Sequence, residues 1–190
     1  MTKTIFTNEN GRIIDVVSIW KINDKELLLI CNTKNKNLLI EWIEKFTFDE
    51  EIHLKESNKY ELIHTFTDSR AINLENFDLP DSNIKQYNDK FESFFISKSS
   101  FFNQHETIDL LFDKELSEEV NNILLSQDFK ELNNDQFLSF KIKNIIPYGQ
   151  NEINLSFNPL ELNSIHLIDF EKGCYVCLLY TSDAADDVAS

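Results

Sequence analysis

The sequence holds few residues of the kinds that break or cross-link a chain. Glycine, proline and cysteine occur only three times each among 190 residues. Three cysteines cannot form a disulfide framework, which excludes a small disulfide-stabilised secreted domain and fits a reducing compartment. With so little glycine, the chain has no glycine-rich phosphate loop, and it also lacks a serine nucleophile elbow.

Long apolar runs and basic residues are scarce as well. No stretch approaches the roughly 20 apolar residues that cross a membrane, and the start, MTKTIFTNENGR, lacks the apolar core of a signal peptide. A net charge of -15 repels phosphate backbones, and Lys141-Ile142-Lys143 is the one weak basic exception. We therefore expect a cytoplasmic protein that binds neither membranes nor nucleic acid directly.

Hydrophobic residues, by contrast, are plentiful. They make up 42% of the chain and include sixteen phenylalanines, enough for the core of one domain. Arg12–Lys21 (RIIDVVSIWK) predicts a largely buried strand, and Glu26–Cys31 (ELLLIC) predicts its hairpin partner across a turn at Asn23-Asp24. Shorter strands are predicted at Glu51–Lys55, Tyr60–Phe66, Phe91–Ile96 and Thr107–Phe112.

Three segments show helical periodicity. The first carries Leu39, Trp42, Ile43 and Phe46 on one face and is predicted to be capped near Asn32 or Thr33. The others are Asp113–Gln127 and Asp135–Ile145. Strands and helices in this order predict an α+β fold, with mixed or antiparallel sheets and packed helices.

The last residues differ in character from the rest. CLLYTSDAADD, which begins at Cys177, contains no Asn, Lys, Ile or Phe, although these fill the preceding chain. The string resembles an in-frame translation of a transposase-type sequencing adapter, so we expect residues 177–190 to be a disordered artefact and residues 1–176 to be the natural part. If the tail were genuine, Cys174 and Cys177 would form a C-x-x-C pair to test for redox chemistry.

Five segments resemble one protein family. FEKGCYV resembles the first half of the K-G-C-Y-x-G-Q-E signature of YgfZ-type folate-binding proteins, relatives of the glycine-cleavage T protein, an aminomethyltransferase. Upstream, NPLE, TNENGRIIDVVSI and KIKNIIPYG are similar to further landmarks of these proteins, and CNTKN stands where the T protein has an N-A-x-N turn. The resemblance implies folate-binding domains of the T-protein type over residues 1–176. It also implies a fragment that lacks the family's opening segment and its C-terminal β-barrel.

The resemblance assigns roles to particular residues. It implies that Asp15 stabilises or deprotonates one-carbon intermediates of tetrahydrofolate and that Asn32 contacts the folate. Within the motif Lys172, Gly173, Cys174 and Tyr175, it implies an essential thiol at Cys174, and Lys172 would favour the thiolate.

The residues alone allow simpler interpretations. Asp15 lies in an apolar strand, where backbone N–H groups or a lysine could satisfy its carboxylate, and burial would raise its pKa. Asn32 could be a helix cap or turn residue, and Cys174 a small buried hydrophobe, the role that we assign outright to Cys31. The four histidines share no metal-ligand spacing, so no metal site is predicted.

The resemblance implies an accessory protein that binds tetrahydrofolate and supports the assembly or repair of iron–sulfur enzymes, including enzymes that modify tRNA. Its partners would be folate and iron–sulfur client proteins, and we expect a monomer. The alternative is a folate-dependent aminomethyltransferase. A single acid at Asp15, and Lys141 and Lys143 where the T protein has Arg and Glu, argue against it. A third possibility is that the fragment has no activity by itself, and we expect residues 1–190 alone to bind folate poorly.

Overall fold

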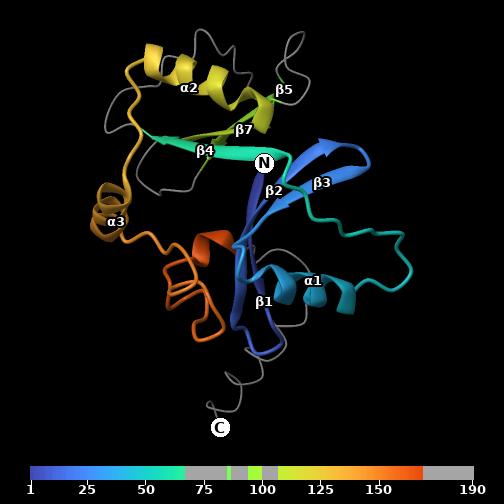
Figure 1. The fold of residues 1–190 in the computed structure, drawn as a ribbon. Helices are drawn as coiled ribbons and strands as arrows, with labels where there is room; N and C mark the ends of the chain where they lie inside the picture. The colour runs from blue at the N-terminus through green and yellow to red at the C-terminus, as the bar shows by residue number, and fades with distance from the viewer. Residues whose placement is uncertain (67–84, 87–93, 100–106, 169–190) are drawn as a thin grey trace. The chain divides into compact units, whose positions relative to one another are not determined.

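The structure is a computed structural model that describes residues 1–66, 85–86, 94–99 and 107–168. The chain divides into two compact units. One contains Thr2–Leu54 together with the chain from Pro147 onward, and the other contains Met1 and Lys55–Ile146. Each unit has its own sheet (Figure 1).

The first unit is built on a three-stranded antiparallel sheet. Its order is β1 (Thr2–Thr7), β2 (Ile13–Asn23) and β3 (Glu26–Ile30), with β2 in the centre. Ile14 and Val17 of β2 form a core cluster with Leu39 of the helix α1 (Lys36–Lys45). The predicted hairpin is confirmed, because Asn23 pairs with Glu26 across the turn.

Residues 147–168 complete the described part of this unit with little regular structure. The Phe157 carbonyl accepts a hydrogen bond from the Ile13 N–H at 2.9 Å, and the Arg12 guanidinium donates to the Ser156 carbonyl at 3.1 Å. A short 3-10 turn, η2 (Ile165–Leu167), contacts β1. These contacts hold a segment more than a hundred residues downstream against the start of β2.

The second unit is a four-stranded antiparallel sheet with helices. The strand order is β4 (Tyr60–Phe66), β7 (Thr107–Asp113), β6 (Phe94–Ser99) and β5 (Lys85–Gln86). After β7 come the 3-10 turn η1 (Lys114–Leu116), α2 (Ser117–Ser126) and α3 (Asn134–Lys143). α2 lies along one face of the sheet (Figure 1), where Val120 packs with Ile108, Leu110 and Phe112.

Within the described residues, two antiparallel sheets and three α-helices confirm the α+β prediction in its coarse form. Several details differ. The predicted strand Glu51–Lys55 is wrong, because these residues have no regular structure. The N-cap of α1 is Asn35, not Asn32 or Thr33. β1 was not predicted at all, and it pairs with β2 along its whole length.

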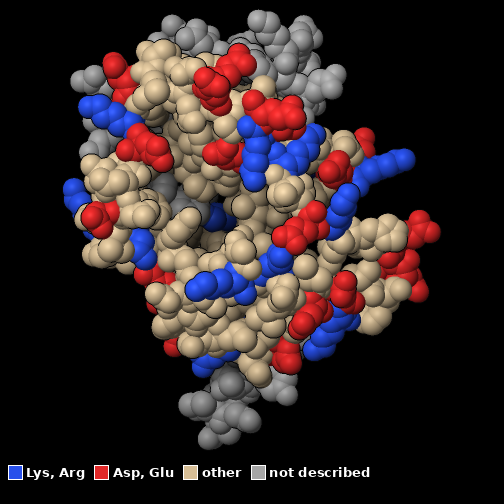
Figure 2. Space-filling view, viewed as in Figure 1, with Lys and Arg blue, Asp and Glu red and all other residues tan. Residues whose placement is uncertain are grey.

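Within the described ranges, no helix combines the length and apolarity needed to cross a bilayer. On the face drawn in Figure 2, acidic and basic side chains are interspersed and do not separate into regions of one sign.

Candidate functional site

Asp15 is the third residue of β2 and is almost completely buried, with 1% of its surface exposed. Both carboxylate oxygens accept hydrogen bonds. The Val16 N–H donates to Oδ1 at 2.9 Å, and the Asn32 N–H donates to Oδ2 at 2.7 Å. The structure therefore brings together the two residues that the resemblance assigns to folate, although they are 17 positions apart in the sequence.

The register of the sheet explains why a carboxylate is placed here. β3 ends at Ile30, which is paired with Ser18 of β2. If the pairing continued by one step of two residues, Val16 would lie opposite Asn32. Asp15 accepts hydrogen bonds from the N–H groups of these two residues, so its side chain satisfies donors at the point where the ladder stops. This agrees with the simpler interpretation of Asp15, in which backbone N–H groups satisfy the carboxylate.

Asn32 begins the turn that leads from β3 to α1. Its side-chain oxygen accepts a hydrogen bond from the Lys34 N–H at 3.0 Å, which makes it a turn residue. Its carbonyl accepts from the Asn35 N–H at 2.9 Å. The turn interpretation of Asn32 is confirmed, and the helix-cap interpretation is wrong because the N-cap of α1 is Asn35, three residues later.

Asn35 is a third member of this cluster and was missed by the sequence analysis. Its side chain is buried, with 7% of the residue exposed, and its amide favours the charged form of the Asp15 carboxylate. Its Nδ2 also donates to the Ile153 carbonyl at 3.2 Å. The cluster thus joins β2, the turn before α1 and the downstream segment. We call Asp15, Asn32 and Asn35 with these contacts the Asp15 cluster.

The environment of Asp15 affects its ionisation in two opposite ways. Burial raises the pKa of the carboxyl group above its ordinary value, because removal from water disfavours the charged form. The hydrogen bonds from Asn32, Val16 and Asn35 act against this rise, since they stabilise the carboxylate. Burial is the larger effect. Such a group can accept a proton or stabilise a nearby positive charge more strongly than an exposed acid can.

The other predicted site residues are not all placed. Lys172, Gly173, Cys174 and Tyr175 lie outside the described residues, as does Cys177. Cys31 packs against the core cluster of the first unit, as expected of a small hydrophobe, but it is half-buried rather than buried. The part of the chain that the structure describes contains no group of three or more His, Cys, Asp or Glu side chains that could hold a metal ion.

The second unit contains a buried polar pair that the sequence analysis also missed. Asp109 of β7 is fully buried, and its Oδ1 lies 2.7 Å from His64 Nδ1 on the neighbouring strand. Among the described residues, no donor reaches its Oδ2. The signal was present in the sequence, because an acid inside the apolar run TIDLLF is the same feature that identified Asp15.

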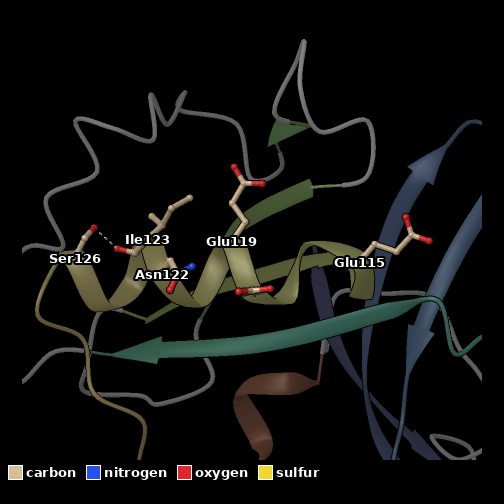
Figure 3. A pocket seen from close by; sticks show the side chains of 6 residues that line it. Glu115, Glu119, Asn122, Ile123 and Ser126 are labelled. Atoms are coloured by element: carbon tan, nitrogen blue, oxygen red, sulfur yellow. Dashed lines mark hydrogen bonds between the residues drawn. The ribbon is translucent and has the colours of Figure 1, made fainter.

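A shallow hollow of about 480 Å³ lies on the surface of η1 and α2 (Figure 3). Glu115, Glu118, Glu119, Asn122, Ile123 and Ser126 line it. Three carboxylates in one lining would repel the negatively charged glutamate part of a folate. No residue of the Asp15 cluster takes part in it, so this hollow does not support a folate site.

The fold and the cluster define an α+β protein with a buried, hydrogen-bonded carboxylate in the central strand of its first sheet. Comparison with protein families finds no family that matches the chain, and comparison with curated proteins finds no match either.

Proposed function

We propose that the chain is part of a folate-binding accessory protein of the YgfZ type, which binds tetrahydrofolate and supports iron–sulfur enzymes in the cytoplasm. The observation that carries the proposal is the hydrogen bond from the Asn32 N–H to Asp15 Oδ2. Asp15 and Asn32, which the resemblance assigns to folate, come from separate elements. A hydrogen bond joins them at the buried carboxylate of Asp15. Cys174 would act with the bound folate, and iron–sulfur client proteins would be the partners.

The chemistry of the Asp15 cluster fits a reduced folate. Each carboxylate oxygen can accept two hydrogen bonds, and each accepts one from the backbone, so capacity remains for a ligand donor. Bound tetrahydrofolate would supply nitrogen atoms that carry one-carbon units. The Asp15 carboxylate would then stabilise positive charge at the ligand or accept a proton from it.

Aminomethyl transfer is the less favoured alternative. The residue after Asp15 is Val16, so the cluster holds one carboxylate and no second acid beside it. Its other members are amides, which donate and accept hydrogen bonds and do not transfer protons near neutral pH. A single buried acid suits binding better than a reaction that needs separate acid and base groups.

A test by ligand-observed NMR can detect the weak binding expected of residues 1–190. Saturation transfer to tetrahydrofolate should be seen with the wild-type chain and should be lost in Asp15→Asn, because the amide cannot stabilise positive charge. Asp24→Asn is the matched control: Asp24 is an exposed acid in the turn of the same hairpin, paired with Lys21, and this variant should bind like wild type.

The proposal is overturned if the wild-type chain gives no transfer, or if Asp15→Asn binds as well as Asp24→Asn. Aminomethyl transfer is tested separately, by supplying an aminomethyl-lipoyl carrier protein and measuring methylene-tetrahydrofolate. Formation of that product at a rate that depends on Asp15 would establish the alternative.

A further inference from the structure

Asn35 occupies the N-cap position of α1 without acting as a cap. At this position the oxygen of an asparagine side chain ordinarily accepts a hydrogen bond from one of the first N–H groups of the helix. Asn35 makes no such bond, and its backbone is helical, with φ -92° and ψ -7°. The side chain is instead buried, and its Nδ2 donates to the Ile153 carbonyl. The helix therefore does not account for an asparagine at this position.

The contacts of Asn35 connect three separate parts of the first unit. Its N–H donates to the Asn32 carbonyl, which tightens the turn whose own N–H group binds Asp15. Its Nδ2 donates to the Ile153 carbonyl, 118 positions downstream. Its side-chain amide also favours the charged form of the Asp15 carboxylate. Within the Asp15 cluster, Asn35 is the residue that links the turn to the segment around Ile153.

We infer that Asn35 is a positioning residue, which fixes the turn after β3 and the segment around Ile153 about the Asp15 carboxylate and keeps that carboxylate available to a cationic ligand group. Its effect on Asp15 does not require folate, whereas its consequence for tetrahydrofolate rests on the proposed function. The groups that face Asp15 are amides from β2, from the turn and from the start of α1. Among the described residues, no charged side chain contributes to the shift of its pKa.

The direct readout is the titration of Asp15. We would follow its side-chain carboxyl carbon by NMR in wild type, Asn35→Ala and Asn35→Ser. Both variants should raise the pKa of Asp15 above its wild-type value, because each loses an amide that stabilises the carboxylate. Asn35→Ser retains a short polar side chain that is well suited to a cap, so it provides a second variant if Asn35→Ala does not fold.

The control is Asn133→Ala. Asn133 is the N-cap of α3, and unlike Asn35 it makes a true capping box with Gln136. Its loss should destabilise the protein without moving the titration of Asp15. A change of pKa that follows Asn35 and not Asn133 separates positioning from a general loss of stability.

The functional readout is tetrahydrofolate affinity across pH. Asn35→Ala should weaken binding about threefold to tenfold at neutral pH, the range expected for one hydrogen bond. It should also move the acid side of the binding profile to higher pH, since Asp15 becomes protonated sooner. An unchanged Asp15 titration in both Asn35 variants overturns the inference. If wild type does not bind tetrahydrofolate, the proposed function fails, and the titration still decides the role of Asn35.

Discussion

At the scale of single residues, the chain places two acids of the same β2–β3 hairpin in opposite environments. Asp15 is buried, and burial raises the pKa of its carboxyl group. Asp24 is exposed in the turn, where Lys21 hydrogen-bonds to it and lowers the pKa of its carboxyl group. Opposite shifts imply opposite effects of pH on stability, which makes the pair a test of the assigned environments.

The Asp15 carboxyl should reduce stability as pH rises. Its folded-state pKa lies above the unfolded value of about 3.9, so in that interval the folded state holds more protons than the unfolded state. The free energy of unfolding contributed by Asp15 is therefore largest below the unfolded pKa and falls as pH rises through the folded pKa. Urea unfolding of wild type and Asp15→Asn from mildly acidic to neutral pH should show that the difference between them depends on pH with this sign.

Asp24→Asn provides the opposite case. The stability contributed by Asp24 is present above the unfolded pKa and is lost as pH falls through its lowered folded pKa. Because the two variants share the same charge change, a general effect of net charge would give the same slope for both. Equal slopes for Asp15→Asn and Asp24→Asn would contradict the burial of Asp15.

Replacement of Asp15 should also lower stability independently of pH. In Asp15→Ala the N–H groups of Val16 and Asn32 lose their acceptors inside the protein. A buried donor left without a partner costs about 1–3 kcal/mol. We expect Asp15→Ala to lose more of the free energy of unfolding than Asp15→Asn, which keeps one oxygen acceptor, as measured by urea unfolding at neutral pH. Equal losses would show that the two N–H groups find other partners.

At the scale of elements, the α3 helix depends on its start. The Asn133 side chain accepts from the Gln136 N–H at 2.9 Å, and the Gln136 side chain accepts from the Asn133 N–H at 3.0 Å. Asn133→Ala removes the first of these bonds and should cost about 1 kcal/mol. Asn134→Ala, one residue further, should cost nothing, because Asn134 lies inside the helix, where alanine is favoured. A loss of stability equal in both variants, measured by urea unfolding, would argue against the capping box.

The sequence predicted those elements whose signal is contained in their own residues. β2, its hairpin and the central turns of the three helices follow from apolar patterns that each segment carries by itself. The prediction of a strand at Glu51–Lys55 failed because alternation of polar and apolar residues shows that a segment could pair, not that a partner strand is present. β1 was overlooked because TKTIFT is short and half polar, and its stability comes from pairing with β2.

The same limit applies to the Asp15 cluster. Asp15 was identified because an acid within an apolar strand is unusual in any fold. Asn35 was not, because its role depends on a contact with Ile153, which no local pattern reveals. Asn32 could be predicted as a turn residue because asparagine is common in turns. The start of α1 could not be predicted, since several polar residues in NTKN could each begin a helix.

At the scale of the whole molecule, the dominant property is negative charge. The chain contains thirty-three acidic and eighteen basic residues. Arg12 and Glu161 form an ion pair at 3.4 Å, and both side chains are exposed. Exposed pairs of this kind contribute little. Repulsion among the acidic residues that are in excess over the basic ones should therefore destabilise the folded chain at low ionic strength, because folding brings like charges closer together.

Salt should relieve this repulsion. Raising NaCl from about 10 mM to 300 mM shortens the screening length from roughly 30 Å to below 8 Å, so the urea midpoint at neutral pH should rise over that range. Screening depends on ionic strength and not on the identity of the ions, so KCl at equal concentration should give the same rise. The rise should level off once the screening length is shorter than the spacing between surface charges. A midpoint that stays constant, or one that continues to climb in proportion to salt, would show that repulsion among the acids is not what limits stability.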